Sequence, residues 1–204
     1  IGTNQFEDLY DCDCILILSP DDTHFEYISK LSQNYNGYIF CEKPIVIKLN
    51  ELSKLENIDE DKKKKIFFNF NFRFSKISEI LKKGIADKKI GEISHVTIIS
   101  THGLAFKKEY LDSWRSNKKK NHHNILDSLA IHYLDLILFQ IGNIKNSNYY
   151  PRLVSKNGNS YDTCRVTLET EHVSTVIYCS YANPKINEIV IIGTNGYILS
   201  LIHI

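Results

Sequence analysis

The chain has 204 residues, of which 43% are hydrophobic and 24% charged, and it carries a formal net charge of +1 at pH 7. This length and composition are typical of a globular protein with one sizeable core or two smaller ones. The near-zero net charge argues against a nucleic-acid partner. No apolar run approaches the roughly 20 residues that a membrane-spanning helix needs, so no membrane partner is expected either.

Strands and helices alternate through the first third of the chain. The predicted strands are the apolar runs 14–18, 38–41 and 66–70. Between them we predict a helix that follows a cap at residue 22 or 23 and ends near residue 34, and a second helix at about 50–57. Asp22 or Thr23 is expected to cap the first helix, and residues 59–65 have the composition of a polar turn. This β-α-β-α-β order indicates a parallel sheet with helices on its faces, whose first strand is expected to be fully buried.

An acid and an amine, Glu42 and Lys43, stand directly after the second predicted strand, which Pro44 ends. Ligands of open α/β sheets bind outside the carboxyl ends of the strands, so both side chains are placed to face a ligand. A lysine suits this edge because burial lowers its pKa and lets it exchange a proton near neutral pH. From the spacing alone, a solvated ion pair without a ligand is the favoured interpretation.

The rest of the chain contains two further helices and becomes strand-like from Tyr149 onward. The later predicted elements are a helix from a Ser75 cap to about Lys83, a strand at 95–100, a long polar segment at 101–121, a helix at about 121–141, and strands at 165–169, 174–181 and 188–192. Turn signals at Asn157-Gly158 and Asn195-Gly196 separate the last strands. These strands predict an antiparallel sheet with one solvated face.

The helix at 121–141 is apolar nearly all round, yet one narrow polar stripe runs along it. The stripe consists of Asn121, Asn124, Ser128, His132 and Asp135. Polar groups on a buried helix must face partners, water or a ligand, so His132 is either a functional group or a core histidine hydrogen-bonded to Ser128 or Asp135. Asp127 lies about 140° from His132 on a regular helix, so it shares that face only if the helix is irregular.

Four motifs, in this order and with these separations, resemble those of the Gfo/Idh/MocA family of nicotinamide-dependent oxidoreductases. They are residues 17–24, Cys41-Glu42-Lys43-Pro44, residues 69–74, and Trp114-Arg115 followed by His132-Tyr133-Leu134-Asp135. The resemblance implies an α/β fold: the C-terminal part of a Rossmann-type parallel-sheet domain at 1–72, then an α+β domain with a largely antiparallel sheet at 73–204.

The resemblance also implies an NAD- or NADP-dependent enzyme that transfers a hydride between nicotinamide and a hydroxyl or carbonyl of a sugar, cyclitol or nucleotide-linked sugar. It assigns catalysis to Lys43, His132 and Asp127, cofactor binding to Ser19, Pro20, His24, Glu42 and Lys43, and substrate contacts to Arg73 and Trp114. A protein of this kind must move one proton and hold the reacting geometry, which a lysine and a facing histidine could do.

Three departures from the family pattern matter. The chain begins downstream of the expected G-x-G-x-x-G turn, so we expect a fragment that binds dinucleotide poorly. Ser128 stands where relatives carry an acid four residues before the histidine, which leaves open whether Ser128 or Asp127 takes that role. The usual glycine run is replaced by residues 121–124. The alternative is therefore a non-catalytic homologue that binds a dinucleotide or sugar and regulates or scaffolds another protein.

The remaining expectations concern metals, location and assembly. The five cysteines form no C-x-x-C pair, which favours reduced thiols and a cytoplasmic protein. A zinc site would need His102, His122, His123 and His132, whose spacing is not a recognised ligand set, so no metal is expected. By resemblance, we expect a homo-oligomer, a dimer or tetramer, formed through the C-terminal sheet.

Overall fold

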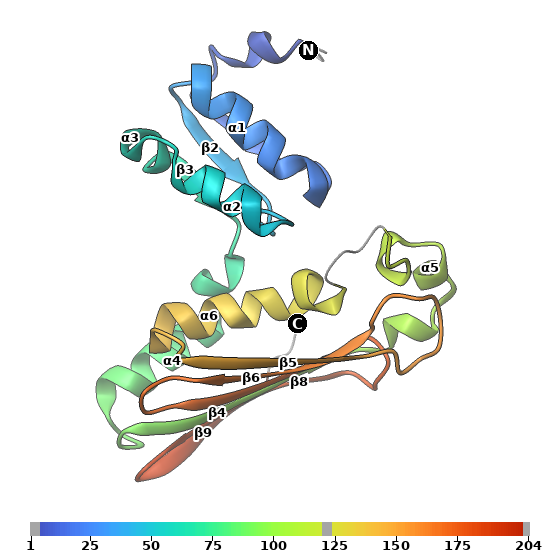
Figure 1. Cartoon of the computed structure of the whole chain (residues 1–204). Coiled ribbons are helices and arrows are strands. Elements are labelled where there is room, and N and C mark those ends of the chain that lie inside the picture. The colour runs from blue at the N-terminus through green and yellow to red at the C-terminus, as the bar shows by residue number, and fades with distance from the viewer. Residues whose placement is uncertain (1–4, 120–123, 202–204) are drawn as a thin grey trace. The chain divides into compact units, whose positions relative to one another are not determined.

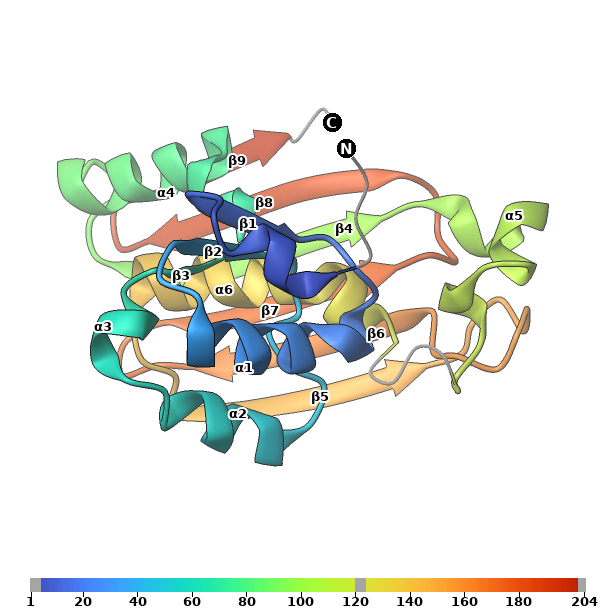
Figure 2. The same cartoon turned by 90° about the horizontal axis from the view of Figure 1, so that it is seen from above.

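The structure is a computed structural model that describes residues 5–119 and 124–201. The chain divides into two compact units, Ile1–Phe70 and Asn71–Ile204. Figures 1 and 2 show the helices and strands of both units. Within the described residues, no helix is both long and apolar enough to cross a membrane.

The first unit is built on a three-stranded parallel sheet in the order β1-β2-β3. Its elements are η1 (Phe6–Leu9), β1 (Cys14–Ile17), η2 (Asp21–Thr23), α1 (His24–Asn34), β2 (Tyr38–Cys41), α2 (Leu49–Glu56), α3 (Glu60–Lys63) and β3 (Ile66–Phe68). The strand-helix alternation read from the sequence is confirmed, and β3 ends two residues earlier than expected.

Apolar side chains on one face of this sheet pack against the helices. Ile15, Ile17 and Ile39 join Ile28 of α1 and Leu55 of α2 in one buried cluster. The expectation that the first strand is fully buried is wrong, because burial alternates along β1 and Leu16 is 60% exposed. The unbroken apolar run could not reveal this, since both cluster-forming helices pack against the same face.

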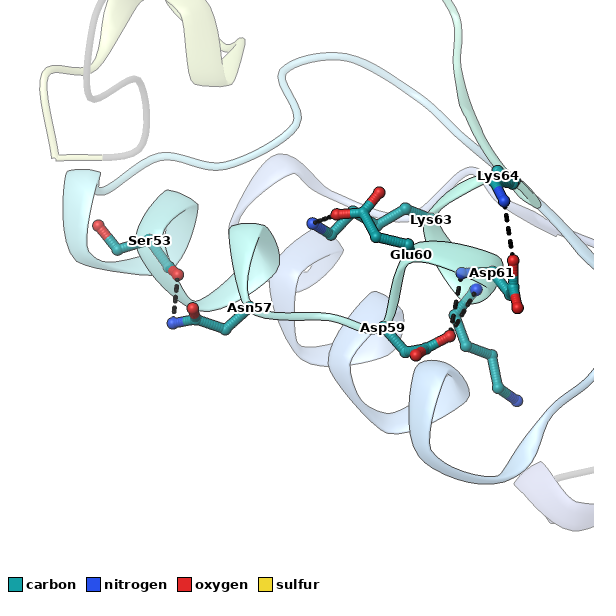
Figure 3. Close-up of polar contacts among 8 residues, drawn as sticks. Ser53, Asn57, Asp59, Glu60, Asp61, Lys63 and Lys64 are labelled. Atoms are coloured by element: carbon teal, nitrogen blue, oxygen red, sulfur yellow. Dashed lines mark hydrogen bonds and ion pairs between the residues drawn. The ribbon is translucent and has the colours of Figure 1, made fainter.

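The predicted polar turn at 59–65 contains a short helix, α3, instead. Asp59 caps it: one carboxylate oxygen accepts hydrogen bonds from the backbone N–H of Asp61 at 2.9 Å and of Lys62 at 3.4 Å. Figure 3 shows this cap together with two lysine–carboxylate pairs of the same turn. The cap gives hydrogen-bond acceptors to backbone N–H groups of the first turn, which have no partner within the helix, and so stabilises a helix in this highly charged segment.

The second unit contains a mixed six-stranded sheet in the order β5-β6-β7-β4-β8-β9, in which only β4 and β7 run parallel. Its strands are β4 (Ile93–Thr101), β5 (Asn146–Arg152), β6 (Thr163–Glu169), β7 (Ser174–Ser180), β8 (Ile186–Gly193) and β9 (Gly196–Leu201). Its helices are η3 (Asn71–Phe74), α4 (Lys76–Asp87), η4 (Gly103–Phe106), α5 (Lys108–Leu111), η5 (Trp114–Ser116), η6 (Leu126–Ala130) and α6 (Ile131–Ile141).

Figure 1 shows α4 and α6 over one face of this sheet, and Figure 2 shows β5 and β9 at its opposite edges. The core lies between helices and sheet, where Val96, Ile98 and Ile177 meet Leu81 and Leu136, all fully buried. The α/β fold class predicted from the sequence is confirmed, with the parallel β4–β7 pair inside a mostly antiparallel sheet.

One predicted boundary in this unit is wrong for a packing reason. The helix expected to end near Lys83 continues through Gly84 to Asp87. Gly84 is buried, and a Cβ built there would lie 2.9 Å from Cδ1 of Ile198. The glycine therefore marks close packing of α4 against β9 instead of a helix end. The polar segment after β4 contains short helices that local composition did not reveal.

Candidate functional site

The turn after β1 holds the first group of predicted cofactor residues. Thr23 Oγ1 donates to the carbonyl of Pro20 at 2.7 Å and lies 2.6 Å from Ser19 Oγ. Thr23, at the N-terminus of α1, forms no side-chain cap there. The capping role expected of Thr23 is therefore wrong, because its hydroxyl closes the preceding turn.

His24 joins this turn to the loop after β2. Its ring is fully buried, with Nδ1 2.7 Å from the carbonyl oxygen of Pro44 and Nε2 3.0 Å from that of Ser19. Both ring nitrogens are thus occupied by backbone of the unit itself. The sequence placed His24 at this edge but gave no sign of its partners.

The predicted acid and amine lie at the carboxyl end of β2. The backbone N–H of Glu42 donates to the carbonyl of Ile17 at 3.0 Å, and Asn69 Nδ2 donates to Glu42 Oε1 at 2.7 Å. Lys43 follows, half-buried, and the Lys43–Pro44 peptide bond is cis. The ends of all three strands are therefore tied around Glu42 and Lys43, as the arrangement of a parallel sheet requires.

In the second unit, the helix that carries His132 begins with a wide turn. Residues Leu126–Ala130 form a π-helix, and the regular α6 starts only at Ile131. The prediction of one regular helix from 121 is therefore wrong over this stretch, and Asn121 lies outside the described residues. Because i→i+5 hydrogen bonds bring residues five apart onto nearly one side, the 140° expected between Asp127 and His132 does not apply.

Contacts at the start of the wide turn direct Ser128 toward the sheet. Ser128 Oγ donates to the carbonyl of Asn124 at 3.0 Å and lies 2.8 Å from the hydroxyl oxygen of Tyr181. Asn124 itself is buried, and its Oδ1 accepts from Ser160 Oγ at 2.6 Å and from the N–H of Tyr161 at 2.9 Å. The helix start is thus anchored to the loop before β6, a contact that no local sequence signal reveals.

His132 is half-buried and packs against an aromatic ring. Its imidazole stacks on Phe72 with 4.8 Å between ring centroids, and Nδ1 is a buried atom. Phe72 also meets the ring of Tyr133 edge-on at 5.1 Å. The aromatic contact restricts the orientation of the imidazole ring.

Arg73, a predicted substrate residue, forms an ion pair inside the unit. Its Nε and an Nη donate to the two carboxylate oxygens of Asp135 at 2.8 and 2.5 Å, and its guanidinium lies 4.8 Å from the centroid of the Phe139 ring. The hydrogen bond that Arg73 donates to Asp135 raises the pKa of Arg73 above its ordinary value. The bidentate pair ties η3 to α6, a structural role that the sequence did not predict.

Trp114, the other predicted substrate residue, is 37% exposed, and the Arg115 guanidinium lies 4.5 Å from its ring centroid. His102 lies nearby in this unit, with its ring 4.8 Å from that of Tyr181. Burial lowers the pKa of His102, and the charge of Arg115 adds to this effect. Within the described residues there is no group of three potential metal ligands, and His122 and His123 lie outside them.

Sequence profiles of one family match both units of the chain. Residues 79–199 match the C-terminal domain of the Gfo/Idh/MocA family, and residues 3–70 match the oxidoreductase family with an NAD-binding Rossmann fold. The chain belongs to the Gfo/Idh/MocA family, which confirms the resemblance inferred from the four motifs.

Among curated proteins, an inositol 2-dehydrogenase of Rhizobium meliloti (strain 1021) is 29% identical over 165 residues, covering 78% of this chain and 47% of that protein. A glucose-6-phosphate 3-dehydrogenase of Bacillus subtilis (strain 168) is 26% identical over 127 residues, covering 61% and 35%. The chain therefore spans about half the length, or less, of the curated relatives that it matches.

Solved structures share the fold. A myo-inositol dehydrogenase from Corynebacterium glutamicum ATCC 13032 superposes with a TM-score of 0.77 at 24% identity, covering 94% of this chain and 57% of that one. An inositol dehydrogenase homologue from Azotobacter vinelandii, crystallised with NAD+, gives a TM-score of 0.81 at 19% identity, covering 96% and 54%. At these identities the likeness concerns the fold alone.

Proposed function

We propose that the chain is part of an NAD- or NADP-dependent oxidoreductase that acts on a CH–OH group of a sugar or cyclitol. The observation that carries the proposal is Lys43 at the carboxyl edge of the parallel sheet, next to a Glu42 that is held by both neighbouring strands. The family description names NAD, and the curated relative from Rhizobium meliloti is an inositol 2-dehydrogenase, which supports a cyclitol or sugar substrate.

The first unit fits a dinucleotide at this edge, because ligands of parallel sheets bind where the strands end. When bound, the nicotinamide would accept or supply the hydride. Ser19, Pro20, His24, Glu42 and Lys43 are the proposed cofactor residues, and His24 contributes by shaping the loops because its ring is enclosed. Lys43 would hold the reacting oxygen and share its proton.

In the second unit we assign the proton-transferring role to His132, assisted by Asp127. The wide turn supports Asp127 over Ser128, because it brings positions 127 and 132 nearer to one side of the helix. The Ser128 hydroxyl is bonded to the Asn124 carbonyl and lies against Tyr181. A carboxylate near an imidazole favours its protonated form, so Asp127 would tune the proton affinity of His132.

We also propose roles for the two domains and a mode of assembly. Residues 1–72 would bind the cofactor, and residues 73–204 would bind substrate through Arg73 and Trp114 and assemble a dimer or tetramer through the sheet. All five cysteines are free, which supports a reducing, cytoplasmic setting.

The experiment measures NAD(H) and NADP(H) binding by calorimetry and myo-inositol oxidation by nicotinamide absorbance. Lys43→Ala is compared with Lys48→Ala, which removes an exposed lysine from the same loop. We expect turnover to fall by about 10²- to 10⁴-fold for Lys43→Ala and to stay unchanged for Lys48→Ala. Equal turnover in the two variants would contradict the assigned role of Lys43.

A second candidate is a homologue that binds a dinucleotide or sugar without catalysis. The observation that favours it is Ser128, a neutral residue at the family's acidic position, whose hydroxyl lies against Tyr181. Cofactor binding with no turnover by either the unchanged chain or Lys43→Ala would select this candidate.

A further inference from the structure

His24 is the one histidine of the first unit, and its surroundings define its chemistry. The ring is fully buried, and each nitrogen lies at hydrogen-bonding distance from a carbonyl oxygen, 2.7 Å for Pro44 and 3.0 Å for Ser19. A carbonyl oxygen accepts hydrogen bonds and cannot donate them, whereas neutral imidazole has one donor and one acceptor nitrogen. Only the doubly protonated ring donates at both positions.

His95 on β4 provides a contrast within the same chain. Its Nδ1 lies 2.6 Å from Ser174 Oγ and its Nε2 lies 2.8 Å from Thr97 Oγ1. A hydroxyl group both donates and accepts, so a neutral ring satisfies both of these contacts. The two histidines therefore differ in what their partners require, although each has both nitrogens engaged.

The two carbonyl groups held by His24 belong to different strand ends. Ser19 closes β1, and Pro44 directly follows Lys43 at the end of β2. On the other side of Lys43, the backbone N–H of Glu42 is bonded to the carbonyl of Ile17 at 3.0 Å. The backbone of Lys43 is thus fixed immediately before and immediately after the residue.

We propose that His24 is a clamp between two strand ends and a positioning residue for Lys43. It holds the Pro44 carbonyl against the turn after β1, and this fixes the direction in which the Lys43 side chain leaves the sheet edge. The inference rests on the proposed function where it concerns catalysis, because a displacement of about 1 Å in a reacting group lowers turnover by about 10²-fold.

Two conservative variants separate the two hydrogen bonds. The amide nitrogen of asparagine takes approximately the place of Nδ1, so His24→Asn retains the donor to Pro44. The amide nitrogen of glutamine takes approximately the place of Nε2, so His24→Gln retains only the donor to Ser19. His95→Gln is the matched control, since it changes a histidine with two engaged nitrogens in the other unit.

The first measurement needs no variant. In NMR spectra of the unchanged chain, we expect a slowly exchanging ring N–H signal from His24, because the ring is fully buried and both nitrogens lie at hydrogen-bonding distance from carbonyl oxygens. A His24 ring whose N–H protons exchange as fast as those of an exposed histidine would overturn the clamp, whatever the variants do.

The second measurement follows Lys43 by its ¹³C-dimethyl-lysine resonance, assigned with Lys43→Arg. We expect His24→Gln to shift or broaden this signal, and His24→Asn and His95→Gln to leave it near its original position. With cofactor and myo-inositol, kcat should fall about 10-fold or more in His24→Gln while KM changes less than about twofold.

The outcomes separate the clamp from the oxidoreductase proposal. An unchanged Lys43 signal in folded His24→Gln would overturn the positioning role. A shifted signal in a chain that oxidises no substrate would support the clamp and count against the proposed function. If His24→Gln does not fold, the ring measurement on the unchanged chain still decides whether the two carbonyl groups hold the ring.

Discussion

Replacing Arg73 by alanine should destabilise the second unit. The side chain of Asp135 is only 10% exposed and that of Arg73 is 39% exposed, and two hydrogen bonds of 2.8 and 2.5 Å join them. Removing the guanidinium leaves a buried carboxylate without its partner, a change that costs about 3–5 kcal/mol for a fully buried pair.

The expected loss lies near the lower end of that range, at about 3 kcal/mol, because water screens the exposed side of the guanidinium. Arg73→Lys keeps the charge but not the bidentate geometry, so it should lose about half as much. The double variant Arg73→Ala/Asp135→Ala should be more stable than Arg73→Ala alone, since no buried charge remains.

Urea unfolding followed by tryptophan fluorescence measures this effect in one unit only, because Trp114 is the single tryptophan of the chain. Lys88→Ala is the control, since it breaks an exposed pair with Glu92 whose side chains are 71% and 77% exposed, and its midpoint should not change. An Arg73→Ala midpoint equal to that of Lys88→Ala would refute the reasoning from burial.

Three further changes test the structure of the second unit. Gly158→Ala should lower the melting temperature and cost about 1–3 kcal/mol, because φ is +76° and the new Cβ would lie 2.4 Å from the Ser116 carbonyl. Burial raises the pKa of Tyr110 to about 12, and the carboxylate of Asp162 adds a smaller effect. As the pH rises, the unfolded chain loses this proton before the folded chain does, so the free energy of unfolding falls between about pH 10 and 12. Tyr110→Phe should make this fall less steep, as measured by urea unfolding at alkaline pH. Asp127→Asn should reduce turnover about 10-fold or more and shift its pH profile, whereas an equal effect of Ser128→Ala would assign the acidic position to the serine.

The predicted elements succeeded where the signal is local. The runs that became β1 and β2 and the Ser75 cap, which accepts from the N–H of Ser78, could be read from neighbouring residues. The errors occurred where packing overrides local signals. Gly84 lies inside a helix because β9 approaches it closely, and this approach depends on a strand more than 100 residues later.

The candidate site shows the same division. The motifs located Lys43 and His132 and identified the family, because turn residues and strand ends are encoded within a few positions. The partners of the site residues were not foreseeable, since no pattern of neighbours specifies which distant backbone group a side chain will meet. The wide turn at 126–130 is also of this kind, because the hydroxyl of its serine lies against Tyr181, which directly follows β7.

By itself, the sequence determined the strand and helix order of the first unit, the family and the residues that stand at the strand ends. Only the tertiary structure decided that His24 bridges 20 residues to Pro44, that Ser128 bridges 53 to Tyr181, and that Arg73 bridges 62 to Asp135. The physical reason is the sequence separation over which each kind of interaction acts. Side-chain periodicity and turn chemistry act over a few residues, whereas these hydrogen bonds exist only after strand register and core packing have brought distant segments together.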